Sequence, residues 1–74
     1  MRKKDFLNHL AKILEKKKIN EKDSLKDLEF DSLHVLDLAT FNDAKFKDLD
    51  IKYEAFEKCK TIEDLIKLYG NKIN

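Results

Sequence analysis

The stretch LEFDSLHVLDL, residues 28–38, breaks the polar and apolar pattern of the chain just where a helix is expected to begin. Asp31 and Ser32 interrupt a run of apolar residues there. Serine and aspartate are favoured at helix N-caps, where a side-chain oxygen accepts a hydrogen bond from an unpaired backbone N–H. The stretch therefore predicts a helix that begins at Asp31 or Ser32. It leaves two roles for Ser32, as a cap or as the attachment point of another group.

The composition limits the classes of protein to which the chain can belong. Of its 74 residues, 42% are hydrophobic and 42% are charged, which is enough apolar material for one small core. The absence of proline and the single glycine argue against an all-β sandwich with its many turns. A chain of this size has little room for a buried catalytic cleft. We therefore expect one all-α domain over residues 1–74 that is not an enzyme.

Cysteine, histidine and charge usage bear on ligands and location. One cysteine cannot form an internal disulfide, and with two histidines it cannot complete a zinc site, so no metal is expected. No apolar run approaches the roughly 20 residues of a membrane span, and polar residues interrupt the region of a signal peptide. These features predict a soluble, cytoplasmic protein. Residues 1–18 hold seven basic and two acidic residues, whereas residues 19–31 hold two basic and five acidic ones.

Hydrophobic periodicity predicts four helical segments. Apolar residues spaced at i, i+4 and i+7 predict an amphipathic helix over residues 3–17. A second helix, residues 31–45, is apolar on nearly all sides, so we expect it to be central and buried on more than one side. A short helix is expected over residues 53–58, and the capping box at Thr61 begins a last helix that the single glycine terminates. The polar loop 19–31 is expected to hold one helical turn and to be pinned by four apolar residues, Ile19, Leu25, Leu28 and Phe30.

The order of residues around Ser32 resembles the signature of acyl and peptidyl carrier proteins. In that family an (S/T)-x-x-(D/E)-L segment leads into G-x-D-S-L at the head of the second helix. The matching positions here are Ser24, Asp27, Leu28, Asp31, Ser32 and Leu33. The aliphatic run that follows, the aromatic Phe46 and the spacing to the last helix also match, so the resemblance covers nearly the whole chain. It implies a four-helix bundle of the acyl-carrier type, with a long loop between the first two helices and a short third helix.

The resemblance also implies a function. Ser32 would carry 4'-phosphopantetheine in ester linkage, and the thiol of this arm would hold an acyl or aminoacyl group as a thioester. A helix N-terminus, with unpaired N–H groups and a positive dipole end, is a suitable seat for the phosphodiester. Asp31 would assist recognition by the phosphopantetheinyl transferase. The other implied partners are an acyl- or amino-acid-activating ligase and acyl-transferring enzymes, which would dock on the second helix at Leu33, His34, Asp37 and Asp43.

Three features depart from the family pattern. Glu29 stands where the family has glycine, and a positive φ there would strain its backbone. The second helix is poor in acidic residues, and the net charge of the chain is +1, whereas many family members are strongly acidic. These features favour the enzymes of a specialised pathway over those of general fatty-acid synthesis. We expect a monomer that binds no nucleic acid and inserts into no membrane.

The sequence suggests roles for four further side chains, and three of them, His34, Cys59 and Phe41, also have a functional interpretation. His34 lies two positions after Ser32 on another face of the helix, and is either an exposed helix residue or a docking contact. Cys59 is expected to be a small core residue rather than a nucleophile. Phe41 is expected in the core, where it could shorten a channel for an acyl chain. His9 is expected to be half exposed on the first helix.

Two other functions are open on the sequence alone. Glu29 and the few acids of the second helix are compatible with a carrier-like interaction module that holds no prosthetic group. The basic residues 1–18 are compatible with a module that binds anionic surfaces through its first helix. Among carriers, fatty acyl, hydroxyacyl and aminoacyl cargoes share this sequence pattern.

Overall fold

Four α-helices and their loops form the structure, a computed structural model that describes residues 1–74. In chain order the elements are α1 (Lys3–Ile13), α2 (Ser32–Lys45), α3 (Tyr53–Glu57), α4 (Ile62–Leu68) and a 3₁₀ turn, Gly70–Lys72. An isolated bridge between Ser24 and Thr61 is the only β-type pairing. The predicted all-α class is confirmed, and α2 and α3 lie within a residue of their predicted bounds. None of the helices has both the length and the apolar character needed to cross a lipid bilayer.

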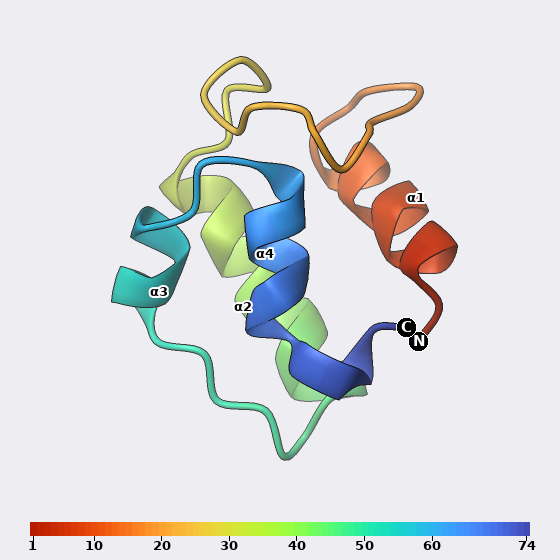
Figure 1. Cartoon of the computed structure of the whole chain (residues 1–74). Helices are drawn as coiled ribbons and strands as arrows, with labels where there is room; N and C mark the ends of the chain where they lie inside the picture. Colours follow the sequence, from red (N-terminus) through yellow and green to blue (C-terminus); the bar gives the residue numbers. More distant parts are fainter.

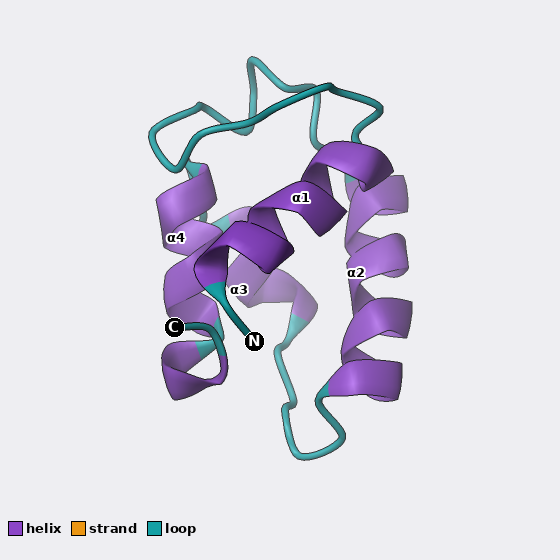
Figure 2. Ribbon diagram, turned by 90° about the vertical axis from the view of Figure 1, so that its right-hand side faces the viewer, coloured by secondary structure: helices purple, strands orange, loops and turns teal.

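The helices pack around one core, and the long first loop covers one end of it. Figure 1 shows α4 in front of α2, with α1 on one side and α3 on the other. The loop between α1 and α2 passes across the top in both views (Figures 1 and 2). The two chain ends lie side by side, where the N–H of Asn74 donates a hydrogen bond of 2.8 Å to the carbonyl of Met1.

The core contains one buried polar pair among apolar side chains. Six large side chains are almost completely excluded from solvent: Phe6, Leu10, Leu38, Ile62, Leu65 and Tyr69. The ring of Tyr69 packs against Phe6 and Phe46, with 4.8 Å and 5.7 Å between ring centroids. Its hydroxyl donates a hydrogen bond of 2.8 Å to Asn42 Oδ1 on α2, and burial raises the pKa of Tyr69 to about 12. The phenol therefore stays protonated at neutral pH and links the end of α4 to α2.

The long loop is anchored to the beginning of α4. The N–H of Leu25 donates to the carbonyl of Lys60 at 2.9 Å, and the N–H of Ile62 donates to the carbonyl of Asp23 at 3.1 Å. The four apolar residues predicted to pin the loop all pack into or against the core: Ile19, Leu25, Leu28 and Phe30. The loop is therefore held in place near its middle, and it leads the chain to the first residue of α2.

The first helix ends at Ile13, earlier than the predicted end at Lys17. The N–H of Lys16 donates to the carbonyl of Ala11 at 2.8 Å, which closes a Schellman motif around Glu15. Glu15 has a φ of 58°, in the left-handed region that glycine usually occupies at this position. The prediction placed the end of the helix in the lysine run, and it was wrong because glutamate at position 15 gives no sign of a left-handed backbone.

The prediction that the second helix is central and buried on more than one side was also wrong. Leu33 and Leu36 are 68% and 62% exposed. The other three helices all lie on one side of α2, which forms an edge of the molecule (Figure 2). Because no further element is present to cover the other side, the apolar residues there remain in water. The residues that α2 buries are Val35, Leu38 and Asn42.

We expect Tyr69→Phe to lower the free energy of unfolding by about 1–2 kcal/mol, because it leaves the buried Asn42 Oδ1 without its donor. Urea denaturation followed by circular dichroism measures the change. Asn42→Leu should also destabilise, and the double variant should lose less than the two single variants added together. Additive losses would contradict an energetically coupled pair.

A second contact between α1 and α2 involves His9. Its imidazole stacks on the ring of Phe41, with 3.9 Å between ring centroids, and its Nε2 is buried without a hydrogen-bond partner. Burial, and then the charge of Lys12, lower the pKa of His9 below its ordinary value. The folded protein therefore favours the neutral ring, while an unfolded chain binds a proton near the ordinary pKa of about 6.5. The sequence predicted a half-exposed His9 and a Phe41 in the core. Both predictions are confirmed, since His9 is half-buried and Phe41 packs against the core.

Stability should therefore fall as the pH drops from about 7.5 to about 5.5, because the unfolded state then binds more protons than the folded state. In His9→Phe, which keeps a ring against Phe41, the decrease in the urea midpoint should be smaller. Asn8→Gln, at an exposed position of α1 that does not titrate in this range, is the matched control and should keep the decrease of the wild type. An unchanged decrease in His9→Phe would show that another group is responsible.

Candidate attachment site at the beginning of α2

The side chain of Asp31, and not that of Ser32, caps the first turn of α2. Its Oδ1 accepts hydrogen bonds from the N–H groups of Leu33, at 3.0 Å, and His34, at 3.3 Å. The backbone N–H of Asp31 donates in return to Nδ1 of His34 at 3.1 Å. This is a capping box in which histidine takes the place usually held by glutamate or glutamine. Of the two residues Asp31 and Ser32, Asp31 is therefore the N-cap, and Ser32 is not needed for capping.

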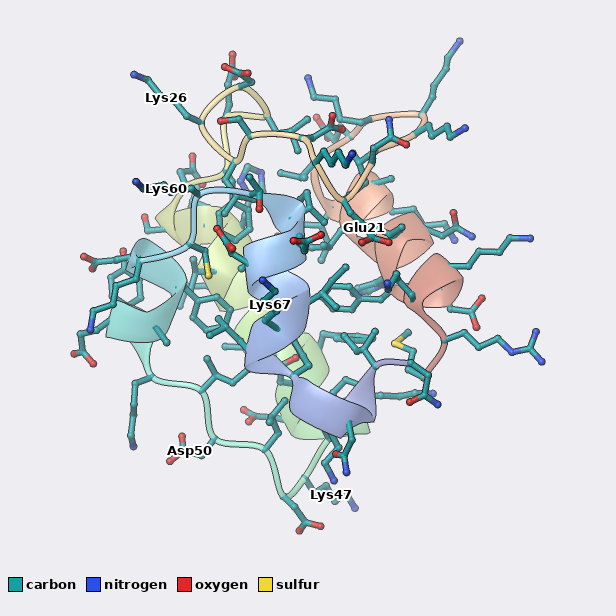
Figure 3. All side chains as sticks on the ribbon, in the orientation of Figure 1. Glu21, Lys26, Lys47, Asp50, Lys60 and Lys67 are labelled. Atoms are coloured by element: carbon teal, nitrogen blue, oxygen red, sulfur yellow. The ribbon has the colours of Figure 1, made fainter.

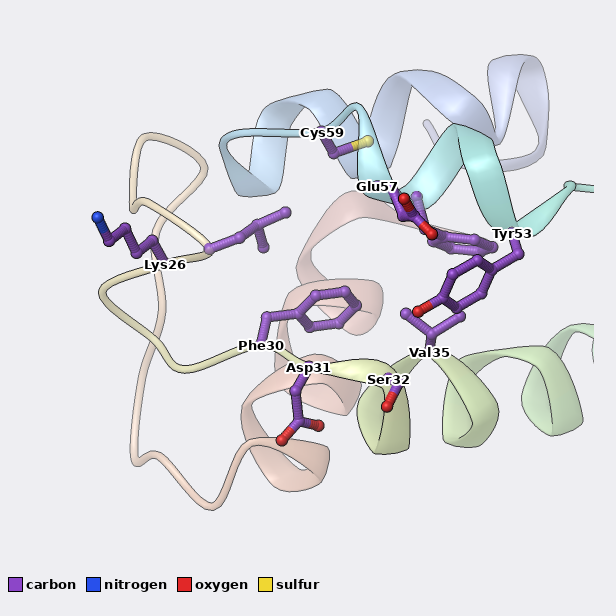
Figure 4. A pocket seen from close by; sticks show the side chains of 10 residues that line it. Lys26, Phe30, Asp31, Ser32, Val35, Tyr53, Glu57 and Cys59 are labelled. Atoms are coloured by element: carbon purple, nitrogen blue, oxygen red, sulfur yellow. The ribbon is translucent and has the colours of Figure 1, made fainter.

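Ser32 is the first residue of α2, and its side chain is exposed. Its hydroxyl takes part in no hydrogen bond with the protein, whereas the hydroxyls of Ser24, Thr40 and Thr61 each bond to the backbone. Figure 4 shows the side chains of Asp31 and Ser32 pointing away from α3, while Phe30 and Val35 point toward it. The Ser32 hydroxyl is therefore open to a large group approaching from solvent.

A groove of about 320 Å³ lies beside Ser32, between the long loop, α2 and α3. We call it the Ser32 groove, and its lining residues are Leu25, Lys26, Phe30, Asp31, Ser32, Val35, Tyr53, Phe56, Glu57 and Cys59. Figure 4 shows Tyr53 and Glu57 reaching in from α3, opposite Phe30 and Val35. Most of the lining residues are hydrophobic, and three of them, Lys26, Asp31 and Glu57, are charged. Phe41 is not part of the lining, so it does not shorten this groove.

Cys59 is the one nucleophilic sulfur near the groove. Its Sγ donates to the carbonyl of Ala55 at 3.4 Å, and burial raises the pKa of the thiol. A raised pKa lowers the thiolate fraction, which is the reactive form. Cys59 packs against the core, as predicted for a small apolar residue.

The surroundings of Ser32 contain no activated catalytic pair. The Nδ1 of His34 already accepts the backbone N–H of Asp31, and the Asp31 carboxylate faces the N–H groups of the helix. No cluster of three or more metal-binding side chains occurs in the protein. A nucleophilic serine requires a base within hydrogen-bond reach. Ser32 therefore has no activating base among its neighbours in the protein.

The expected phosphate seat on the first turn of α2 is largely taken. The Asp31 carboxylate accepts hydrogen bonds from the N–H groups of Leu33 and His34. Among the N–H groups at the beginning of α2, only that of Ser32 has no partner in the protein. The negative charge of Asp31 also opposes a phosphate at the same place. The expectation of a seat on these N–H groups was therefore wrong.

The predicted docking residues divide between two environments. Leu33, Asp37 and Asp43 are exposed, and with Leu36 they lie on one face of the helix, which we call the outer face of α2. The side chain of His34 is only 22% exposed and stacks on Phe30, with 5.7 Å between ring centroids. The expectation of an exposed His34 was wrong, because its ring is used by the capping box. Leu36 was missed, because periodicity alone did not show which apolar face of α2 is uncovered.

The loop that leads to the site contains a strained residue. The N–H of Leu28 donates to the carbonyl of Ser24, which forms the predicted single helical turn, and the N–H of Phe30 donates to the carbonyl of Leu25 to end it. Glu29 between them has a φ of 57°. This is the position where the carrier signature has glycine, and the expected backbone strain at Glu29 is confirmed.

Comparison of the chain with protein families, with curated proteins and with solved structures found no match in any of the three.

We expect Glu29→Gly to raise the free energy of unfolding by roughly 0.5–1 kcal/mol, because glycine adopts a positive φ without steric cost. Glu57→Gly, at a helical position in α3, is the matched control and should lower it by about 1 kcal/mol. Both changes are measured as urea midpoints. A Glu29→Gly variant less stable than the wild type would mean that the carboxylate makes an unrecognised contact.

Proposed function

We propose that this protein is a carrier that holds an acyl or aminoacyl group as a thioester on a 4'-phosphopantetheine arm attached to Ser32. The observation that carries the proposal is the state of the Ser32 hydroxyl. It is exposed at the first residue of α2 and makes no hydrogen bond to the protein, while Asp31 alone supplies the cap. A serine that is not needed for the helix, in the D-S-L position of the carrier signature, is available for modification.

The arrangement of the helices supports a fold of the acyl-carrier type. A long loop separates α1 from α2, and α3, with 5 residues, is the shortest α-helix. Glu29 also supports the proposal, because its left-handed backbone is the conformation for which the signature glycine is suited. The loop therefore takes this conformation without that glycine.

In this proposal the chain contributes position and access, and the arm supplies the reactive thiol when it is attached. The Asp31 capping box holds the first turn of α2, so that Ser32 is presented at a fixed place. The Ser32 groove offers apolar side chains beside it. Tethering raises the local concentration of the cargo at each docked enzyme. The proposal assigns no catalytic step to the chain itself.

The outer face of α2 is the proposed docking surface for cytoplasmic enzymes: the transferase that installs the arm, the ligase that loads it and the enzymes that use the cargo. Two exposed leucines, Leu33 and Leu36, offer apolar contacts of the kind found at the centre of interfaces. Asp37 and Asp43 add negative charge on the same face. This combination fits an apolar pocket on the partner with a basic rim.

A carrier-like interaction module without an arm is the second candidate function. It is favoured by the uncovered leucines, because that apolar surface can bind a partner whether or not Ser32 is modified. A partner that binds the wild type and Ser32→Ala equally well, with no modification of either, would favour this function.

Incubation of the purified protein with coenzyme A and a phosphopantetheinyl transferase of broad specificity should add one phosphopantetheine group, measured as the intact mass. Ser32→Ala should fold normally and gain no mass. Ser24→Ala is the matched control and should gain the same mass as the wild type, since Ser24 is the only other serine in the chain. A wild-type mass that stays unchanged would remove the support for a carrier.

A further inference from the structure

A second groove, of about 490 Å³, lies on the other flank of the molecule and contains none of the residues of the Ser32 groove. Its walls come from the first half of α1 and from residues 17–20, the segment that returns along α1 after the turn at Glu15. We call it the lysine groove. Its lining residues are Lys3, Lys4, Leu7, Asn8, Lys17, Lys18, Ile19 and Asn20.

The fold brings two pairs of lysines to the same groove, Lys3 with Lys4 and Lys17 with Lys18. Lys3 forms an ion pair with Glu21, with 3.1 Å between Nζ and Oε1, and Figure 3 shows Glu21 beside α1. Lys4, Lys17 and Lys18 are exposed, and none of them takes part in an ion pair. Like charges lining one concavity repel each other, and an anion bound between them would offset that repulsion.

The chemistry of the lining restricts the class of anion. Lysine ammonium groups bind phosphate as compact point charges, and the side-chain amides of Asn8 and Asn20 add neutral donors. The lining holds no aromatic side chain and so lacks the stacking platform used to bind single-stranded nucleic acid. The volume lies within the roughly 300–1,000 Å³ of small-molecule sites.

We propose that the lysine groove binds a ligand that carries clustered phosphate groups, either a soluble polyphosphorylated compound or the phosphorylated headgroup of a lipid. The turn at Glu15 is what creates the site. It folds the lysine run back beside Lys3 and Lys4, whereas a helix continued to residue 17 would direct the run away from them. This binding site is independent of any modification at Ser32.

The test is a titration of the unmodified full chain with inorganic tripolyphosphate, followed by ¹⁵N–¹H correlation spectra. We expect saturable shifts confined to residues 3–8 and 17–20, and an affinity that falls as ionic strength rises. The double variant Lys17→Gln/Lys18→Gln should bind about tenfold more weakly or worse. Unchanged spectra elsewhere show that the variant is folded.

Lys45→Gln/Lys47→Gln is the matched control, because it removes the same charge from exposed lysines at the far end of α2, where Figure 3 places Lys47. It should bind tripolyphosphate like the wild type. An equal loss of affinity in the two double variants, or shifts that do not saturate, would overturn the proposal by showing only general attraction to positive charge.

A second experiment distinguishes a soluble phosphorylated compound from a lipid headgroup. The protein is sedimented with vesicles of phosphatidylcholine alone and with vesicles that also contain phosphatidylinositol 4,5-bisphosphate. Binding to the second vesicles only, with the same dependence on Lys17 and Lys18, identifies a lipid headgroup. Saturable tripolyphosphate binding without vesicle binding identifies a soluble compound. Absence of both kinds of binding overturns the proposal.

Discussion

The hydrogen bonds of the Asp31 carboxylate to the first turn of α2 are the constraint on which the candidate site depends. One oxygen satisfies two backbone N–H groups that would otherwise be unpaired, and His34 closes the box from inside the helix. The capping box stabilises the beginning of α2, and the neighbouring hydroxyl of Ser32 makes no hydrogen bond to the protein. A site for covalent modification needs such a residue, held in place by its neighbours and still open to solvent.

The parts of the fold that follow from local chemistry could be predicted from the sequence. The cap at Asp31, the capping box at Thr61 and the stop at Gly70, whose φ is 57°, all use residue types with strong positional preferences. The end of α1 could not be predicted, because Glu15 adopts a conformation that its residue type disfavours. The role of His34 was missed for a similar reason, since histidine is an unusual member of a capping box.

The exposure of Leu33 and Leu36 on α2 could not be predicted from the apolar pattern of the sequence. An apolar pattern shows that a residue prefers burial, but the number and placement of neighbouring helices decide which residues obtain it. Here three helices cover one side of α2, and Leu33 and Leu36 remain on the other. The same folding places acids on the outer face of α2 and unpaired lysines in the lysine groove beside α1. Two surfaces with distinct chemistry thus coexist on one small domain.

The buried hydrogen bond between Tyr69 and Asn42 constrains the rotation of α2 about its own axis. A turn of the helix by one residue, about 100°, would carry the amide oxygen away from its phenolic donor, and it would also move the buried Val35 and Leu38 out of the core. The bond and the buried apolar residues of α2 together fix the rotation of this helix about its axis. Contacts deep in the core thereby set the direction in which the serine at the beginning of the helix faces.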